Sequence, residues 1–398
     1  MTIERADIAV VGLGLIGAAT LRHLADRQPD ASIVGIGSTE PANLAAHEGV
    51  FASHYDSGRI TRRLDRRWEW SVLASRAIAG YPEIEARSGI RFHRPTGVVF
   101  CDSAAGVAAL VSVADLLGVS YDVGPIATTG QPDERLRFAA ASHVLREPAP
   151  AGHIDPRRLI TAQLAIAATM RATVQRAEAR RIERRGAHWA ILDADNQLLS
   201  EATIVVIAVG PHTDELDGLP VIPKLRVHRE TVVMAHLGSA EARRLAGIPA
   251  GISVIDHPIY EDFYYVPPTD YPDGSVRLKM GATMHDLIDL HTAADRREWM
   301  RGSCHRDELP AIRALIEELV PGIAADRWES TPCMITETPT RLPYLDIIGD
   351  GLVVAAGGNG YAAKSSDAIG AIAAGLALDG RWTDAELDAD DFQVIIAA

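Results

Sequence analysis

A glycine-rich turn near the N-terminus places the strongest constraint on how this chain of 398 residues folds. Residues 6–11 are predicted to form a short buried strand, and Gly12, Gly14 and Gly17 follow it directly in the segment GLGLIG. The first glycine permits a tight turn, the second lets a pyrophosphate approach the backbone, and the third allows a helix to pack closely on the strand. A helix N-terminus also offers unpaired N–H groups to phosphates. The pattern predicts a dinucleotide-binding unit of the Rossmann type.

The residue that would hold the adenosine ribose is less evident. Folds of this type usually place an acidic side chain about twenty residues after the turn, at the end of the second strand. Here the region after the predicted strand 32–36 contains Ser38, and the nearest carboxylate, Glu40, comes a few residues late. No arginine follows to hold a 2′-phosphate, so NADP is not favoured. Glu40, Ser38 and backbone groups all remain candidates.

Further segments of the nucleotide-binding type recur in the middle and at the end of the chain. Residues 202–209 and 352–356 are predicted strands, and the second runs into Gly357, Gly358 and Gly360 before a helix from about 363. Elsewhere the pattern predicts a hairpin at 91–100, an antiparallel sheet within 224–279 and one helix over 296–319.

These recurrences favour a mixed α/β (α+β) protein in which two domains are woven together. We expect a Rossmann-like cofactor-binding domain interleaved with an antiparallel-sheet substrate domain. The first is assigned residues 1–85, 151–222 and 331–398, and the second residues 86–150 and 223–330.

Composition limits the partners. The net charge of −14 argues against a nucleic-acid surface. Cys101, Cys304 and Cys333 form an odd set without metal-ligand spacing, so we expect no disulfide framework, no metal site and a cytoplasmic protein. No signal peptide is visible, and no apolar run reaches the roughly 18 residues of a membrane helix. A monomer and a dimer both remain open.

Three more segments, read together with the glycine turn, resemble a known family. They are SHYDSGRITR at 53–62, PCMITETP at 332–339 with Tyr-Leu-Asp at 344–346, and AGGNGYAAKSS at 356–366. In order and spacing they are similar, over nearly the whole chain, to the monomeric sarcosine oxidase and N-methyltryptophan oxidase family. That family belongs to the larger D-amino-acid-oxidase-like group of FAD-dependent oxidoreductases.

The resemblance implies an enzyme that binds FAD and oxidises the C–N bond of a secondary amino acid to an imine. Hydride passes to the flavin, and O2 reoxidises it to give H2O2. Cys333 then corresponds to the site of covalent flavin attachment, and Lys279 to a lysine that activates oxygen over the flavin. Arg62 and Lys364 correspond to the ligands of the substrate carboxylate, which suits a guanidinium fork and a point charge. Close to the flavin the resemblance places Ser53, His54 and Arg59, besides the glycines of both turns.

Two details bear on the substrate pocket. Tyr264 and Tyr265 are neighbours on a predicted strand and face opposite sides, so one of them belongs to the core; we assign Tyr265 to the site. The family's histidine four residues beyond the strand lysine is replaced by Thr283, and His-Gly-Phe-Lys by Tyr-Ala-Ala-Lys at 361–364. These smaller side chains predict a substrate other than sarcosine, bulkier or cyclic.

Two other functions remain open. One is a flavin-dependent dehydrogenase or biosynthetic tailoring oxidase that acts on a different C–N or C–O bond. The other is a flavin-binding protein without catalytic activity, which no amine would reduce.

Overall fold

The first of two large sheets builds a Rossmann-like unit. In the computed structural model, which describes residues 5–139 and 142–397, its parallel centre has the strand order β9-β2-β1-β12-β19. Parallel strands covered on both faces are almost continuously apolar, as β1 illustrates, with five of its seven residues buried. The strands are β1 (Arg5–Val11), β2 (Ile33–Ile36), β9 (Thr173–Gln175), β12 (Leu198–Ile207) and β19 (Leu352–Ala356), flanked by antiparallel β10 (Arg181–Arg185), β11 (His188–Leu192) and β18 (Tyr344–Gly349).

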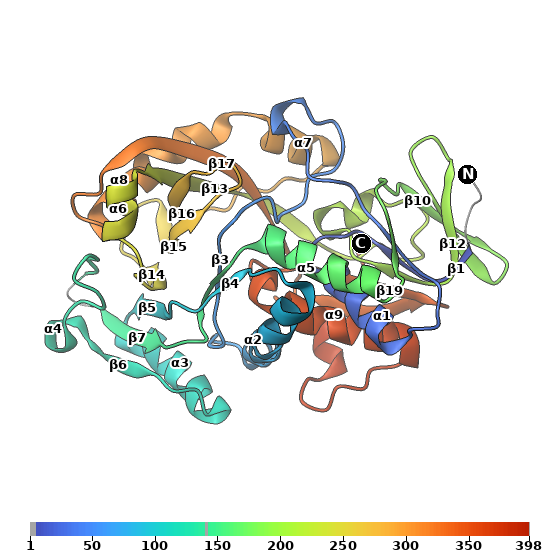
Figure 1. The fold of residues 1–398 in the computed structure, drawn as a ribbon, viewed down its shortest axis with the longest axis horizontal. Coiled ribbons are helices and arrows are strands. Elements are labelled where there is room, and N and C mark those ends of the chain that lie inside the picture. The colour runs from blue at the N-terminus through green and yellow to red at the C-terminus, as the bar shows by residue number, and fades with distance from the viewer. Residues whose placement is uncertain (1–4, 140–141, 398) are drawn as a thin grey trace.

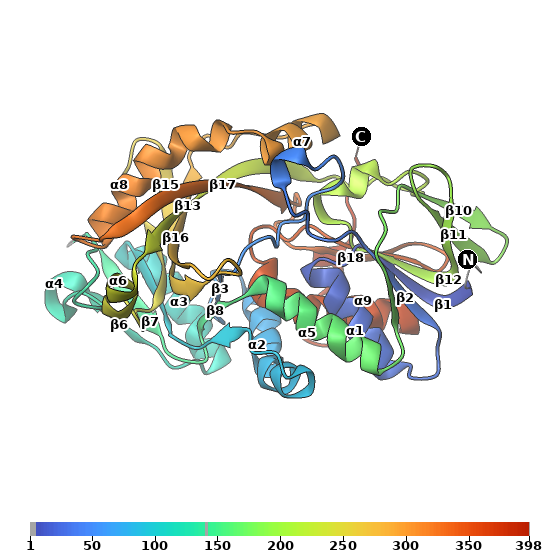
Figure 2. The same cartoon turned by 45° about the horizontal axis from the view of Figure 1, so that its top comes forward.

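Four helices pack beside this sheet (Figures 1 and 2): α1 (Leu15–Arg27), α2 (Trp68–Ser88), α5 (Pro156–Thr169) and α9 (Ala362–Asp379). α1 and α9 come from opposite ends of the chain yet lie in direct contact. Their backbones approach so closely that a Cβ added to Gly370 would lie 2.6 Å from the Cβ of Ala19. The N- and C-terminal segments therefore close one core together.

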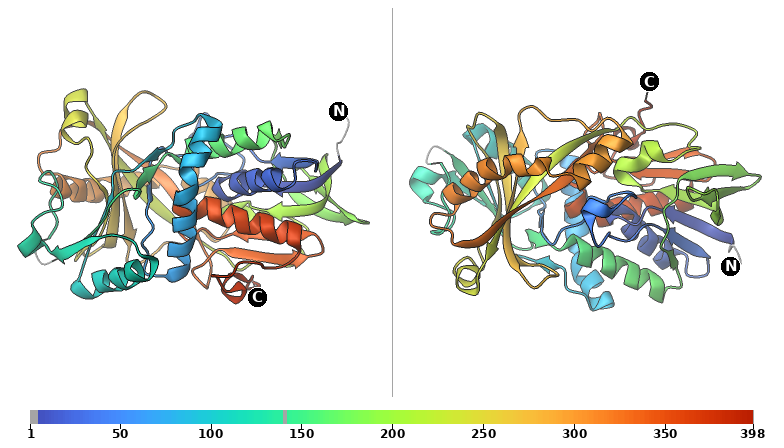
Figure 3. Two further views of the ribbon diagram at one scale, coloured as in Figure 1. Left: turned by 60° about the horizontal axis from the view of Figure 1, so that its bottom comes forward. Right: turned by 90° about the horizontal axis from the view of Figure 1, so that it is seen from above.

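The second large sheet is antiparallel except for one parallel pair, and its strand order is β17-β13-β16-β15-β14-β5-β7-β6. Helix α8 (Leu309–Leu319) covers it on the side away from the first unit, and α2 stands between the two sheets (Figure 3). The strands are β5 (Val98–Asp102), β6 (Asp122–Pro125), β7 (His143–Glu147), β13 (Arg226–Leu237), β14 (Ala250–Val254), β15 (Tyr260–Asp270), β16 (Val276–Met284) and β17 (Ala325–Glu337).

The remaining elements are short or peripheral. A small sheet of β3 (Arg59–Thr61), β8 (Gly152–Ile154) and β4 (His93–Arg94) joins the two units. The other helices are α3 (Ala104–Leu117), α4 (Ile126–Thr129), α6 (Ser239–Arg244), α7 (Ala293–Arg301) and the 3-10 turns η1 (Leu44–Ala46), η2 (Gly210–Glu215), η3 (Cys304–Glu308) and η4 (Ala389–Phe392).

The predicted fold class is confirmed, with local corrections. The boundary placed at 331 falls inside β17, which pairs with β13 over nearly its whole length. The expected hairpin at 91–100 is wrong, because β4 and β5 belong to different sheets. The helix predicted over 296–319 is two helices, since α7 ends before Gly302 and α8 begins at Leu309-Pro310.

Within the described residues, no helix is long and apolar enough to cross a membrane. The same residues contain no cluster of three or more His, Cys, Asp or Glu side chains able to hold a metal ion.

Candidate active site

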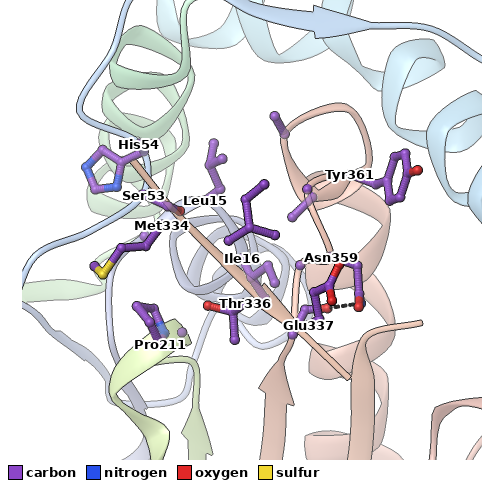
Figure 4. A pocket seen from close by; sticks show the side chains of 18 of the residues that line it. Leu15, Ile16, Ser53, His54, Pro211, Met334, Thr336, Glu337, Asn359 and Tyr361 are labelled. Atoms are coloured by element: carbon purple, nitrogen blue, oxygen red, sulfur yellow. Dashed lines mark hydrogen bonds between the residues drawn. The ribbon is translucent and has the colours of Figure 1, made fainter. Parts of the chain in front are cut away.

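A cavity of about 660 Å³ extends between the two units. Part of its lining comes from the glycine turns of the first unit, and part from β15 and β17 of the second sheet. Figure 4 shows Leu15 and Ile16 of α1 facing Ser53, Met334 and Thr336 across it. Segments separated by more than 300 residues thus meet around one space.

The N-terminal turn has the geometry that a dinucleotide needs. Gly12 has φ +95°, and a Cβ there would lie 2.3 Å from the carbonyl oxygen of Ala208. A Cβ on Gly17 would lie 1.8 Å from the Gly12 oxygen, so Gly17 serves helix–strand packing and does not line the cavity. A Cβ added to Gly14 would meet only Nδ1 of His54, at 4.0 Å, and no side chain caps the start of α1. The helix N-terminus is therefore open to a phosphate, and the turn fits FAD.

Glu40 does not line the end of the cavity near the N-terminal glycine turn. It forms a bidentate ion pair with Arg157, with distances of 3.0 and 2.7 Å from Nε to its two carboxylate oxygens, and it lies outside the lining. Ser38 and Glu178 do line the cavity. Glu178 follows β9, which pairs with β2, so it reaches the end of the second strand from a distant part of the chain. Sequence spacing from the glycine turn could not indicate it.

The C-terminal glycine turn lies against the same cavity. Gly357 and Gly360 have φ +83° and +77°, and a Cβ on Gly357 would lie 2.3 Å from the Thr338 side chain. Asn359 accepts a hydrogen bond from the Thr338 backbone N–H at 2.9 Å, which ties the turn to the end of β17. Gly357, Gly358 and Gly360 all line the cavity, and α9 begins two residues later.

Cys333 on β17 is a free, half-buried thiol at the cavity wall. Its Sγ lies 3.7 Å from Nη2 of Arg59, which also donates to the Ser53 carbonyl at 3.0 Å. Burial raises the pKa of Cys333, while Arg59 opposes that rise. Ser53, His54 and Arg59 line the same space. Burial and the neighbouring arginines lower the pKa of His54 to about 3, so its ring is neutral.

Lys279 is fully buried on β16 and does not line the cavity. Its Nζ donates to the Asp56 carboxylate and to the Gly58 carbonyl, and it lies 5.5 Å from the centre of the Tyr264 ring. Burial and the nearby Arg59 lower the pKa of Lys279 to about 8. Burial would raise the pKa of Asp56, but Lys279 and Arg59 hold it well below its usual range. Lys279 is thus a cation behind the cavity wall.

Arg62 and Lys364 meet at a carboxylate that no sequence pattern indicated. Asp65 accepts a hydrogen bond from Nη1 of Arg62 and another from Nζ of Lys364, both at 2.8 Å, and all three side chains are at least nine-tenths buried. Arg62 also packs over the rings of Phe100 and Tyr361, 5.2 and 5.6 Å from their centres. Burial and Arg62 lower the pKa of Lys364 to about 8. Two cations and one carboxylate give this cluster a net charge of +1 at the cavity wall.

The assignment of Tyr265 to the site is wrong. Tyr265 is fully buried in the core beneath the second sheet, where its ring lies over Gly251. Because successive side chains of a strand alternate, Tyr264 faces the opposite side and lines the cavity, as does Thr283 on β16.

Lysine is rare in this sequence, yet two of the lysines are buried. Of 39 basic residues other than histidine, Lys224, Lys279 and Lys364 are the only lysines. Lys224 is exposed, whereas Lys279 and Lys364 are 1% and 3% exposed. A lysine is a compact charge whose pKa responds to burial, unlike a guanidinium. Two of the three lysines in the sequence therefore lie where burial lowers their pKa.

Comparison with known proteins identifies the class. A family model described as FAD dependent oxidoreductase (DAO) matches residues 7–376, so the chain belongs to that family and is an FAD-dependent oxidoreductase.

Particular relatives are more distant. The tRNA 5-methylaminomethyl-2-thiouridine biosynthesis bifunctional protein MnmC of Burkholderia thailandensis is 28% identical over 88% of this chain and 50% of its own length. The chain thus spans about half the length of the curated relatives it matches. Among solved structures, NikD, an unusual amino acid oxidase essential for nikkomycin biosynthesis, is 18% identical with a TM-score of 0.77, over 99% of this chain and 98% of its own. Glycine oxidase from Geobacillus kaustophilus is 21% identical with a TM-score of 0.75, over 98% of both chains. At these sequence identities, the similarity to the two solved structures shows a shared fold alone.

We predict that Asp65→Asn destabilises the protein by about 3–5 kcal/mol at neutral pH, because it leaves two buried cations without their carboxylate. Since Lys364 and Arg62 depress the pKa of Asp65, this stabilisation is present above the unfolded value near 3.8 and is lost as pH falls below it. Urea unfolding of both proteins across pH 3–7 measures the difference.

Asp379→Asn is the matched control for this prediction, because it breaks the exposed pair with Arg27 and should cost less than about 1 kcal/mol. Equal losses in the two variants would contradict a buried charge triad.

Proposed function

We propose that the protein is an oxidase of the sarcosine oxidase type, which oxidises the C–N bond of a secondary or cyclic amino acid to an imine and reduces O2 to H2O2. One observation carries the proposal above others. The cluster of Arg62, Asp65 and Lys364 lines the same cavity as Cys333 and has a net charge of +1. A substrate carboxylate would neutralise that charge.

The two glycine turns and the start of α1 would hold FAD, with Ser53, His54 and Arg59 beside it. When bound, the flavin supplies an acceptor for the electron pair and hydrogen of the substrate's α-C–H bond. The chain's own residues bind and orient. Arg62 and Lys364 would fix the carboxylate, and their positions are already set by Asp65, so little freedom is lost when a substrate binds.

The pocket would take a side chain larger than hydrogen. Thr283 and Ala363 both line the cavity and are small, while the aromatic rings of Tyr361 and Phe100, which also line it, pack against Arg62. This lining supports a bulkier or cyclic secondary amino acid. The free cysteines Cys101, Cys304 and Cys333 suit a reducing cytoplasm.

A second candidate is a flavin-dependent dehydrogenase or a tailoring oxidase that acts on a different C–N or C–O bond. The fold of NikD, an amino acid oxidase of a biosynthetic route, supports this alternative. A flavin-binding protein without catalytic activity is disfavoured by a large cavity lined with charged and aromatic side chains.

The leading proposal predicts that a secondary or cyclic amino acid bleaches the flavin of the purified protein without oxygen, and that readmitted oxygen restores the colour with one H2O2 per turnover. Proline, pipecolate and N-methylated amino acids, beside their primary counterparts, form the first screen. Bleaching without peroxide on readmission would favour the dehydrogenase. A flavin that no amine or alcohol reduces would favour the non-catalytic alternative.

We further propose that FAD is attached through a thioether from Cys333. Protein denatured in acid should then retain its yellow colour and its fluorescence on a gel, whereas Cys333→Ser should release FAD. Cys304→Ser, which changes an exposed thiol outside the cavity lining, serves as the control and should retain the flavin. Complete release from the unchanged protein would refute the link.

We also propose that Lys279 favours the reaction with O2 by stabilising negative charge that develops on oxygen. Lys279→Met should slow reoxidation by about 10²-fold or more, with a smaller effect on anaerobic reduction. Lys224→Met, at the exposed lysine, should change neither rate. Reoxidation is followed by stopped-flow absorbance after mixing with oxygenated buffer, and an unchanged rate in Lys279→Met would disprove the role.

A further inference from the structure

One buried carboxylate in the cavity lacks a cationic partner. Three acidic side chains that line the cavity are buried: Asp65, Glu230 and Glu337. Asp65 pairs with Arg62 and Lys364, and Glu337 pairs with Arg341 and His228. Glu230 has 9% exposure and, in the part of the chain that the structure describes, forms no ion pair within 4.0 Å. An isolated buried carboxylate is costly, and its presence beside a cavity points to a ligand.

The position of Glu230 places it where substrate chemistry would occur. On β13 it lies directly opposite Cys333 of β17, so the two side chains share a face of the sheet. The next strand, β16, carries Gly281, over which the Tyr264 ring extends; a Cβ on Gly281 would lie 2.6 Å from the Tyr264 hydroxyl. The missing side chain lets the Tyr264 ring reach across β16 toward Glu230.

The groups around Glu230 leave its carboxylate able to take up a proton. Arg59 from β3, His228 from β13, and Tyr264 and Asp262 from β15 face it, with Cys333 on β17. Burial raises the pKa of Glu230, and Arg59 and His228 only partly oppose the rise. Burial and Glu230 also raise the pKa of Tyr264 well above its ordinary value, so Tyr264 remains a hydrogen-bond donor.

We propose that Glu230, positioned by Tyr264, binds the ammonium group of the substrate and accepts its proton. This inference rests on the proposed amino acid oxidase activity. An N–H bond of the ammonium breaks, its proton moves to a carboxylate oxygen of Glu230, and the electron pair stays on nitrogen. With this lone pair free, the nitrogen would form the C=N bond as the electron pair and hydrogen of the α-C–H bond leave for the acceptor that a bound flavin would supply. Burial raises the pKa of Glu230 above its ordinary value, which makes it a better proton acceptor than an exposed carboxylate.

The assignment completes the recognition of a zwitterion. The cluster of Arg62, Asp65 and Lys364 offers one net positive charge for the carboxylate, and Glu230 offers one negative charge for the nitrogen. Together they favour an amino acid over an amine or a carboxylic acid alone.

The test compares two isosteric ligands bound to the holoenzyme under anaerobic conditions. N-methyl-2-aminoisobutyrate has no hydrogen on its α-carbon, and 2,2-dimethylbutanoate replaces its N–H group by CH2. Calorimetry in buffers of different ionisation enthalpy measures affinity and the protons released to the buffer. The unchanged protein should prefer the amine and release no proton, because Glu230 retains it, and Glu230→Gln should reduce that preference at least about tenfold. Tyr264→Phe should lower the preference less.

Matched measurements separate the possible failures. Glu329→Gln, on β17 but outside the cavity and paired with His236, should behave like the unchanged protein. Retained flavin absorbance and thermal stability show that Glu230→Gln is folded, and Glu230→Asp should restore part of the preference. If Glu230→Gln keeps the preference for the amine, or if the unchanged protein shows none, the assignment is overturned. The proposed oxidase fails separately, through a flavin that no amino acid bleaches.

The pH dependence of anaerobic flavin reduction gives a second readout. Protonated Glu230 cannot accept a proton, so the reduction rate of the unchanged protein should fall as pH drops through the pKa of Glu230. Glu230→Gln should lack this acidic limb, and an identical limb in both proteins would contradict the role.

Discussion

The free-energy cost of burying charged side chains determines how this site is arranged. Lys279, Lys364 and Arg62 are almost completely buried. In the protein interior, the desolvation cost of an unpaired cation would be prohibitive. Asp56 and Asp65 offset the cost through short, charge-assisted hydrogen bonds that join residues far apart in the chain. Each carboxylate also fixes the place of its cation, so the site is rigid before any ligand arrives.

The interleaving of the two units follows from how these charges are held. β17 pairs with β13 in the second sheet, and a hydrogen bond just after its end ties it to the turn at Asn359, which precedes α9 of the first unit. α9 carries Lys364 and packs against α1, whose N-terminus borders the same cavity. Movement of one unit against the other would separate Lys279 on β16 of the second unit from Asp56 of the first, and would leave both buried charges unpaired.

Sequence patterns predicted the features that depend on neighbouring residues. The turn at Gly12–Gly17, the strand at 352–356 and the following glycines appear where they were expected, because a positive φ or a buried parallel strand imposes its requirement locally. The break between α7 and α8 was missed, since the helical periodicity continues on both sides of Gly302.

The amino-acid sequence by itself determined the class of fold and the presence of a dinucleotide turn, since both are encoded in the spacing of a few adjacent residues. Only the tertiary structure decided which charges meet. It joined Arg62 to Lys364 through Asp65, placed Glu178 and not Glu40 at the end of the second strand, and turned Tyr264 rather than Tyr265 toward the cavity. Among the residues that the structure describes, it also left Glu230 without an ion pair within 4.0 Å. The reason is that the energy of a charge depends on its burial and its partners in space, and neither is a property of local sequence.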